Sequence, residues 1–461
     1  MKLKKLTALG LAAIAALSLI GCGEKKQEEP ANKEPAQEDS KEAGAGSGSE
    51  AADTGADSAA GTKISFLTCQ GKFKEEYRTM AAEIKKDHGI EIDFQVVPDN
   101  EYYSLLKVKL STSEVPDVFE YNLPTNNEEI GAAEFCEDLS GESWVSRLAN
   151  PDLIKDYNDG KIYGLPKESS SGYMAVYYNK EVLTAAGITD PKPKTYEEFL
   201  GILDTLKEKS SDVIPLYMTN KDSWTTQIFM TCGYPVALDA AGGETFQKLL
   251  NNEISWTDVP EFKLVLDNYQ ALFENGYTNE DYLSATYDTA AEKIATGKAA
   301  MYLSTEGFAA DIYGKYPDCE LGSFIIPYND VDKMATGAYV QGLFVPKAGK
   351  QVDKVKEFLN IWSDPKYQDL YYKTQPGFPA YTDVDGGDVV PCVQNLVDTY
   401  INSGNYVYQI NDQMAECSTV WPDLWNYYNE MIAGTKSSEE VLSTWQKQYV
   451  DFMQQQGHEG F

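Results

Sequence analysis

Histidine is scarce in this 461-residue chain, in which only His88 and His458 occur. Ser-His-Asp and Cys-His catalysis need an imidazole base, and many tight metal sites draw on clustered imidazoles. His88 stands beside a predicted helix end and His458 in the C-terminal tail, so neither fits such a site. No HExxH, Walker A, GxGxxG or GxSxG motif stands out. The sequence therefore predicts no catalytic residue, metal or cofactor, although its many carboxylates leave a two-carboxylate glycosidase open.

Positive charge is also in short supply, because 39 Lys and Arg residues face 72 Asp and Glu residues, a net charge of -33. Such a chain repels phosphates, which argues against nucleic acid as a partner. Beyond residue 20, no apolar run approaches the length of a membrane span. This balance fits a solvated extracellular protein.

CxxC pairs are missing, and six dispersed cysteines follow the N-terminal region: Cys69, Cys136, Cys232, Cys319, Cys392 and Cys417. Their dispersal argues against metal ligation. An even number of cysteines outside the cell permits disulfides, but a chain of this size needs no such crosslinks. Disulfides and buried thiols therefore remain equally open.

The one long apolar run, residues 6–20, follows a lysine-rich start and ends at "LIGC" (19–22). It is too short and too Ala-rich for a comfortable membrane span. The order resembles a bacterial lipobox, in which the apolar segment is cleaved off and the cysteine thiol is lipidated. We therefore expect a lipoprotein signal peptide over 1–21 and a lipid on Cys22. An uncleaved signal anchor or a buried Cys22 is the alternative.

The segment that follows Cys22 lacks aromatic and large aliphatic residues up to residue 62. Such a composition cannot bury enough apolar surface to offset the entropy of ordering, so residues 22–62 are predicted to be a disordered tether. The remaining chain is longer than one hydrophobic core usually serves, which predicts two lobes.

The rest of the chain alternates predicted strands and helices. Residues 63–68 and 90–97 read as strands around a helix over 74–89, and this β-α-β unit predicts a parallel sheet. Helices are also expected over 194–209, 353–364 and 437–452, the first and last with capping-box spacing. The fold class is therefore α/β.

Three stretches, in order, resemble one family. They are "DGKIYGLPKESSSGYMAVYYNKEVLTAAGI" with the following "PKPKTYEEFLGIL" (159–203), "IATGKAAMYLSTEGFAADI" (294–312) and "GLFVPKAGKQVDKVKEFLNIWSDPKYQDLYYKTQPGFPAYTDV" (342–384). Their order and spacing resemble the sugar-binding, maltose-binding-protein-like family of extracellular solute-binding proteins of ABC importers. The resemblance covers residues 63–461.

The resemblance implies a type II periplasmic-binding-protein-like fold, in which two lobes, each a mainly parallel sheet flanked by helices, enclose a ligand. Three crossings between the lobes are then expected near 171–174, 326–336 and 376–382. Lobe 1 would comprise 63–172 plus 330–377, and lobe 2 would comprise 173–328 plus 378–461.

The resemblance also implies ligand contacts at loops that face the cleft. The candidates in lobe 1 and at the crossings are Gln70, Lys72, Glu120, Tyr121, Asn122, Tyr173, Tyr339, Gln341 and Phe378. Those in lobe 2 are Asp222, Trp224, Glu306, Phe308 and Trp421, whereas Trp425 is expected in the core. A pyranose has an apolar face that an aromatic ring can cover and hydroxyls that carboxylates and amides can bind.

The function implied is a lipid-anchored receptor that captures a carbohydrate, an oligosaccharide by expectation, and delivers it to the membrane subunits of an ABC importer. It would be a monomer held through Cys22 at the extracellular face of the bacterial cytoplasmic membrane. The alternatives are a receptor for a polyamine or peptide, a surface-anchored carbohydrate-active hydrolase, and a structural lipoprotein with a filled cleft.

Overall fold

The computed structural model describes residues 61–414, 417 and 420–461. The expected signal peptide, Cys22 and nearly all of the expected tether lie outside these residues. Within them, no helix combines the length and the apolar character that crossing a bilayer requires.

Eleven strands lie in three sheets of the described chain. They are β1 (Lys63–Cys69), β2 (Glu91–Val97), β3 (Val118–Leu123), β4 (Gly164–Pro166), β5 (Ala175–Asn179), β6 (Ile214–Tyr217), β7 (Ala299–Ser304), β8 (Leu321–Phe324), β9 (Met334–Thr336), β10 (Val340–Phe344) and β11 (Tyr406–Tyr408).

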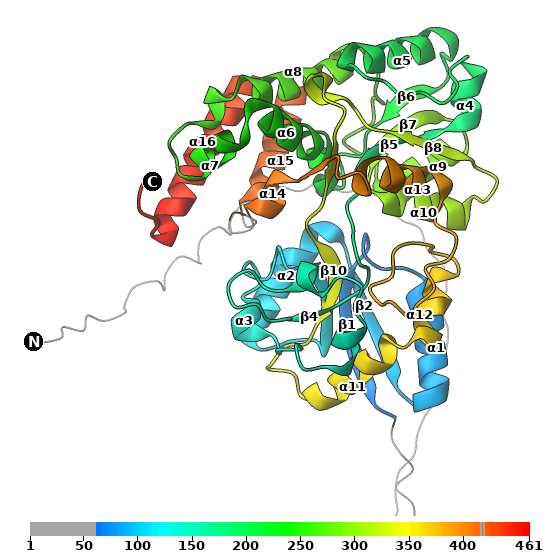
Figure 1. The fold of residues 1–461 in the computed structure, drawn as a ribbon, viewed down its shortest axis with the longest axis vertical. Helices are drawn as coiled ribbons and strands as arrows, with labels where there is room; N and C mark the ends of the chain where they lie inside the picture. The colour runs from blue at the N-terminus through cyan, green and yellow to red at the C-terminus, as the bar shows by residue number, and fades with distance from the viewer. Residues whose placement is uncertain (1–60, 415–416, 418–419) are drawn as a thin grey trace, which may run out of the picture. The chain divides into compact units, whose positions relative to one another are not determined.

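Helices separate most of these strands (Figure 1). They are α1 (Glu76–His88), α2 (Asp99–Thr112), α3 (Ala132–Phe135), α4 (Lys180–Ala185), α5 (Tyr196–Lys209), α6 (Ile228–Ala241), α7 (Gly243–Leu250), α8 (Pro260–Glu274), α9 (Tyr287–Ala295), α10 (Glu306–Lys315), α11 (Val352–Trp362), α12 (Pro365–Tyr372), α13 (Pro391–Leu396), α14 (Ile410–Gln413), α15 (Trp421–Ile432) and α16 (Ser438–Gln456).

The first sheet has five strands in the order β2-β1-β3-β10-β4 and forms the centre of lobe 1. The predicted β-α-β unit is confirmed, because β1 pairs in parallel with β2 after α1 ends at Gly89, which has a φ of 67°. Strand β10 arrives from lobe 2 without a crossover helix and runs antiparallel to both β3 and β4.

The second sheet has four strands in the order β6-β7-β5-β8 and forms the centre of lobe 2. Strand β5 runs antiparallel to β7 and to β8, and only β6 and β7 are parallel. Both sheets are therefore mixed, and the expectation of mainly parallel sheets is wrong in this detail. The reason is that β5 and β10 enter their sheets from the other lobe.

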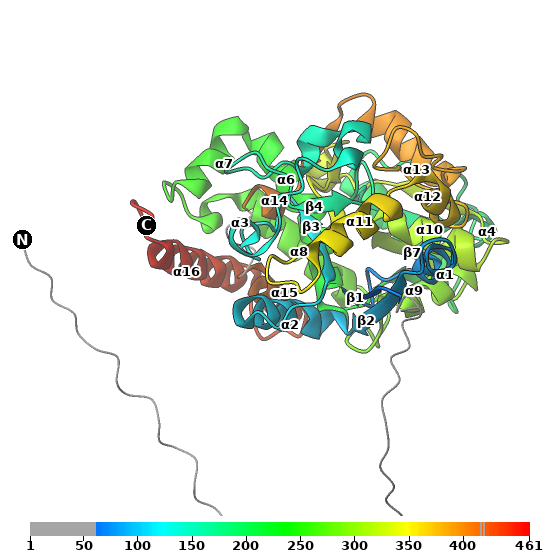
Figure 2. The ribbon, with the colours of Figure 1, turned by 90° about the horizontal axis from the view of Figure 1, so that it is seen from below.

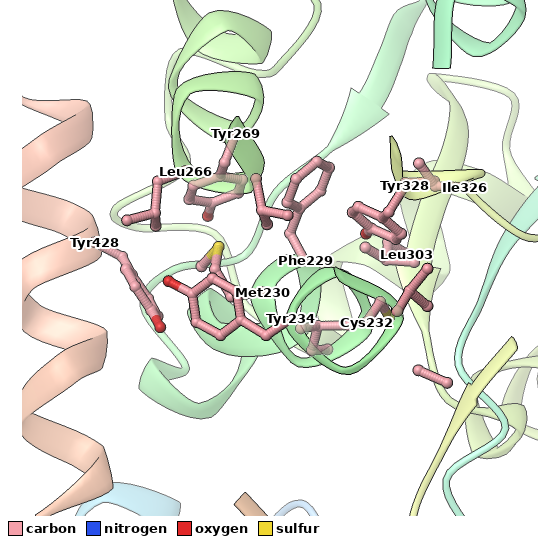
Figure 3. Close-up of a cluster of buried hydrophobic side chains, with 14 of the residues drawn as sticks. Phe229, Met230, Cys232, Tyr234, Leu266, Tyr269, Leu303, Ile326, Tyr328 and Tyr428 are labelled. Atoms are coloured by element: carbon pink, nitrogen blue, oxygen red, sulfur yellow. The ribbon is translucent and has the colours of Figure 1, made fainter. Parts of the chain in front are cut away.

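Each lobe has its own hydrophobic core. One core lies around the five-stranded sheet, and two lie on the opposite faces of the four-stranded sheet. Strand β5 shows the two faces, because Val176 and Tyr178 enter one core while Ala175 and Tyr177 enter the other. Figure 3 shows part of the core that Val176 and Tyr178 enter. There Phe229 of α6 packs on Tyr269 and Tyr328 at ring-centre distances of 5.2 and 4.9 Å.

Lobe 2 also contains the C-terminal helices. Helices α15 and α16, orange and red in Figures 1 and 2, run beside each other and both contact α8. The Ser437–Glu440 capping box at the start of α16 is confirmed. At α5 only half of the expected box forms, because the Glu198 carboxylate accepts from the backbone of Lys194 and not from that of Thr195.

The segments between the lobes pack against one another. The Gly337 N–H donates to the Gly172 carbonyl over 3.1 Å, and the Ser169 N–H donates to the Phe378 carbonyl over 2.8 Å. The small parallel pair of β9 and β11 lies next to these segments, where the Gln409 N–H donates to the Thr336 carbonyl.

The expected lobe boundaries stay a prediction, but the packing of two segments in the hydrophobic cores bears on two of these boundaries. Met334 and Ala335 pack in the cores of lobe 2, which would move the second crossing from the expected boundary at 330 to after Thr336. Ala380 and Tyr381 pack in the core of lobe 1, which would move the third crossing beyond 378 and before Val390, a residue of the lobe 2 core.

Cys69, Cys136, Cys232, Cys319 and Cys392 form no disulfide. Burial is the largest influence on each of these thiols and raises its pKa. The sequence left disulfides and buried thiols open, and in the structure these five cysteines are thiols.

We expect Gly172→Ala to destabilise the protein more than Gly404→Ala. Both glycines have a positive φ, 80° and 72°, so either alanine adds about 1–2 kcal/mol of backbone strain. A Cβ at Gly172 would also lie 2.8 Å from the backbone nitrogen of Gly337, whereas a Cβ at Gly404 meets nothing within 4 Å. Urea unfolding of both variants would measure the difference, and equal losses would show that the close packing of the crossings contributes nothing.

Candidate functional site

A cavity of about 360 Å³ is lined by residues of both lobes. Lobe 1 contributes the loop after β1, the first turns of α2 and the end of β3. Lobe 2 contributes the 3-10 helix Ser223–Gln227, the first turns of α9 and α10, and the start of α15. The crossing segments, the loop after β3 and parts of α6, α12, α13 and α14 form the rest of the wall. The volume lies within the range of about 300–1,000 Å³ that small-molecule sites occupy.

Nine of the residues predicted from the sequence line this cavity. They are Lys72, Tyr121, Asn122, Trp224, Glu306, Tyr339, Gln341, Phe378 and Trp421. Segments that are up to hundreds of residues apart in the chain therefore meet as the resemblance implies.

Five other predicted residues are not among those that line the cavity. Gln70 is exposed in the turn after β1. Tyr173 is buried and hydrogen bonds to Ser170, and Phe308 is fully buried against Tyr177 and Tyr302. Glu120 and Asp222 lie behind the wall, where each holds a cavity residue in place.

Glu120 forms a buried ion pair with Lys167 beneath the floor of the cavity. The Lys167 Nζ lies 2.6 Å from Glu120 Oε1 and 3.0 Å from Gln341 Oε1, and the two charged side chains are 8% and 0% exposed. Thr68 donates to the other Glu120 oxygen. Burial is the largest single influence and opposes the charge of Lys167, but Glu120, Tyr371 and Glu168 together outweigh it and raise the pKa of the ammonium. The pair therefore fixes Gln341, one of the predicted contacts.

Three carboxylates bind the backbone of the crossing segments. Glu306 accepts from the N–H groups of Gly172 and Tyr173 over 3.1 and 2.7 Å. Asp412 accepts from Ala338, and Glu168 accepts from Gln341, each over 2.8 Å. All three acidic residues line the cavity.

Burial dominates the ionisation of these carboxylates. It raises the pKa of Glu306 to about 7 in spite of the backbone hydrogen bonds, and it raises the pKa of Asp412 to about 7 in spite of the Ala338 N–H. Burial likewise raises the pKa of Glu168, against the opposing charge of Lys167. These carboxylates therefore keep their protons to a higher pH than exposed carboxylates do.

An aromatic pair stands on the lobe 2 wall. The half-buried Trp224 ring lies 5.7 Å from the Tyr287 ring, centre to centre. Asp222 precedes the 3-10 helix that carries Trp224 and accepts from the Tyr287 N–H over 2.7 Å. Asp222 thus joins the two segments that carry the rings.

Trp421 and Trp425 form another part of this wall. Trp421 is only 7% exposed, and its ring stacks on Trp445 at 4.7 Å and 25°. Trp425, expected in the core, is half-buried and lines the cavity one helical turn later. Most of the Trp421 ring therefore belongs to the core, whereas the side chain of Trp425 is more exposed.

The chemistry of the wall combines ring surface with hydrogen-bonding groups. Trp224, Tyr339 and Phe378 offer aromatic surface, while Asn122 and Glu168 offer amide and carboxylate groups. No group of three or more His, Cys, Asp and Glu side chains in the described chain could hold a metal ion. Such a wall suits an uncharged ligand with both apolar faces and hydroxyls.

Reasoning from sequence missed Tyr103, Lys167, Glu168, Tyr287 and Asp412. Lys167 and Glu168 directly follow the "YGLP" turn that precedes the first crossing, so the resemblance could have pointed to them. Tyr287 stands at the first position of α9, after the Thr286 cap. No local pattern marks Tyr103 or Asp412.

The sequence of this chain is similar to those of known solute-binding proteins. The family model described as bacterial extracellular solute-binding protein matches residues 70–369. The melibiose/raffinose/stachyose-binding protein MelE of Bacillus subtilis is 24% identical over 300 residues, which cover 63% of this chain and 67% of the relative. An uncharacterized ABC transporter extracellular-binding protein of Pyrococcus horikoshii is 26% identical over 48% of each chain.

Solved structures show the same fold. A sugar transporter protein of Bacillus licheniformis in complex with stachyose has a TM-score of 0.69 at 22% identity, over 85% of this chain and 100% of that one. A solute-binding protein, RafE, in complex with raffinose has a TM-score of 0.68 at 19% identity, over 83% and 98%. These likenesses confirm the predicted two-lobe α/β fold.

We expect Lys167→Met to destabilise the protein by about 3–5 kcal/mol, because it leaves the Glu120 carboxylate buried without a cation. The matched control is Lys354→Met, which removes the ion pair between Lys354 and Glu357. These two side chains are 59% and 57% exposed. Such exposed pairs contribute little to stability, because water and salt screen them. Guanidinium unfolding would measure both losses, and a small loss for Lys167→Met would mean that the pair is dispensable.

Glu306→Gln should weaken the dependence of stability on pH. The pKa of Glu306 is about 7 in the folded protein, raised by burial from an ordinary 4.5. The folded state therefore holds a proton that the unfolded state has lost between these two values. This contribution to stability is fully present below pH 4.5 and is lost as the pH rises through 7.

The measurement is the free energy of unfolding in urea at pH 5 and pH 8. The unmodified chain should lose more stability across this interval than Glu306→Gln does. Equal losses would show that Glu306 does not titrate there.

Proposed function

Since this chain belongs to the bacterial extracellular solute-binding proteins, we propose that it is a receptor that captures a carbohydrate between its two lobes for an ABC importer. The proposed ligand is a neutral oligosaccharide, which the receptor binds and releases without hydrolysing it. It also includes a lipid on Cys22, which would keep a single copy of the receptor at the outer face of the cytoplasmic membrane.

The observation that carries the proposal is the composition of the cavity wall. Rings from both lobes stand beside amide and carboxylate groups, with Trp224 and Tyr287 on one side and Tyr103 and Asn122 on the other. A sugar ring needs both kinds of surface, because each buried hydroxyl without a partner costs about 1–3 kcal/mol. A ligand that touches both lobes stabilises the closed arrangement, which is the form that importer subunits would recognise.

The relatives support the same class of ligand. MelE is named for melibiose, raffinose and stachyose, and two solved neighbours hold stachyose and raffinose. A further neighbour is described as a chitin oligosaccharide binding protein. These sugars are therefore the first probes for this chain.

The test is thermal unfolding of the full chain with raffinose, stachyose, chitin oligosaccharides and monosaccharides, and with polyamines and peptides as controls. A ligand at a thousand times its Kd stabilises the folded state by about 4 kcal/mol. A shift with one class of glycan, without hydrolysis of it, supports the receptor. A shift only with a control ligand would keep the fold and overturn the sugar, and hydrolysis of the glycan would favour the hydrolase.

We expect Trp224→Ala to weaken binding of the glycan identified in this way by at least about tenfold, because the variant removes a half-buried ring from the wall. Trp224→Phe should keep most of the affinity, since it keeps an aromatic face. Isothermal titration calorimetry would measure both, with circular dichroism to verify the fold. Unchanged affinity in Trp224→Ala would remove Trp224 from the site.

A further inference from the structure

Helix α10 belongs to lobe 2 but makes an ion pair with lobe 1. Its Asp311 lies 2.8 Å from the Nζ of Lys74, in the segment between β1 and α1. The two side chains are 5% and 21% exposed, so water screens the pair less than it screens an ion pair on the surface. Most other ion pairs of the described chain join residues of the same lobe.

The same helix touches lobe 1 one turn later. Gly314 faces the end of α12, and a Cβ at this position would lie 3.3 Å from the carbonyl oxygen of Thr374. At the other end of α10, Glu306 binds the backbone of the first crossing. Helix α10 therefore lies along the boundary between the two lobes, from the first crossing at its N-terminal end to α12 near its C-terminal end.

The ion pair also connects to the aromatic wall. The second oxygen of Asp311 accepts from the Tyr287 hydroxyl over 3.1 Å. The Tyr287 backbone in turn donates to Asp222, at the start of the 3-10 helix that carries Trp224. One chain of contacts thus runs from lobe 1 through Asp311 to both rings of the lobe 2 wall.

We propose that Lys74 and Asp311 form a latch that holds the lobes together in the absence of ligand and sets the position of the Tyr287 and Trp224 rings. The two residues act by positioning the walls of the cavity. Any ligand that needs both lobes binds only the fraction of molecules in which they meet, so loss of the latch weakens its apparent affinity by the same factor. The effect on affinity rests on the proposed function, whereas the effect on the lobes does not.

The experiment measures the distance between the lobes without ligand. Spin labels attached through p-acetylphenylalanine at the exposed positions Val108 of α2 and Leu264 of α8 leave the native cysteines untouched. Pulsed electron resonance then compares the full chain with Lys74→Met, Asp311→Asn and the double variant. We expect each single variant to shift the distribution to longer distances, and the double variant to match them, because all three lack the same ion pair.

Lys354→Met is the control, because its ion pair with Glu357 lies within α11 and the distribution should not change. Unchanged distributions in both single variants would overturn the latch. Additive shifts in the double variant would also overturn it, since they would show that Lys74 and Asp311 act separately.

A second measurement separates the latch from direct contact with ligand. Stachyose affinity should fall by about fivefold or more in each single variant and no further in the double variant. A loss in Lys74→Met alone would overturn the latch in favour of a direct contact. If the unmodified chain binds no glycan, the proposed function fails, and the distances alone decide the latch.

Discussion

At the first and second crossings between the lobes the chain leaves its sheet, and several backbone N–H groups need partners that no neighbouring strand supplies. Carboxylates provide them here, with Glu306 at Gly172 and Tyr173 and Asp412 at Ala338. A buried N–H without a partner costs about as much as a lost hydrogen bond. The path of the crossings, and with it the position of each wall of the cavity, depends on these acceptors.

The use of carboxylates as acceptors for these backbone N–H groups also explains why acidic side chains line the cavity. Carboxylates accept strong hydrogen bonds from backbone donors, but burial makes their charge costly. Lys167 offsets the charge of Glu120 directly, whereas Glu306 and Asp412 have only backbone donors. Their pKa values near 7 are the expected result of burial without a nearby cation, which the backbone hydrogen bonds offset only in part. The carboxylates of Glu306 and Asp412 therefore hold the backbone of the crossings and also line the cavity.

The elements that the sequence predicts well are local ones. Strand β1, helix α1 and the Ser437 cap depend on periodicity and on near neighbours, and the structure contains all three. The direction of β10 could not be read from local pattern, because it depends on where the chain returns from lobe 2. The half-formed box at Thr195 is a similar case, since another backbone donor, that of Lys194, competes for Glu198.

The candidate site divides in the same way. Motif resemblance placed Trp224 and Tyr339 on the wall, because each belongs to a loop at a recognisable place in the fold. It could not tell that Asp222 and Glu120 stand one layer behind, since a carboxylate that holds a neighbour looks the same in sequence as one that binds a sugar. Tyr103 and Asp412 were missed because only the packed chain brings them to the cavity.

The five-stranded sheet places β10 between β3 and β4, although more than 170 residues separate β10 from β4 along the chain. As the polypeptide emerges from the ribosome, β3 lacks its neighbour β10 until the segments of lobe 2 that precede β10, and β10 itself, have been made. Phe119 and Tyr121 would stand at an open edge during that time. An unpaired apolar edge is a template for aggregation. The core of lobe 2 also needs α15 and α16, so the residues of lobe 1 are complete first, and the open edge of β3 before β10 is made is the part that a chaperone would need to protect.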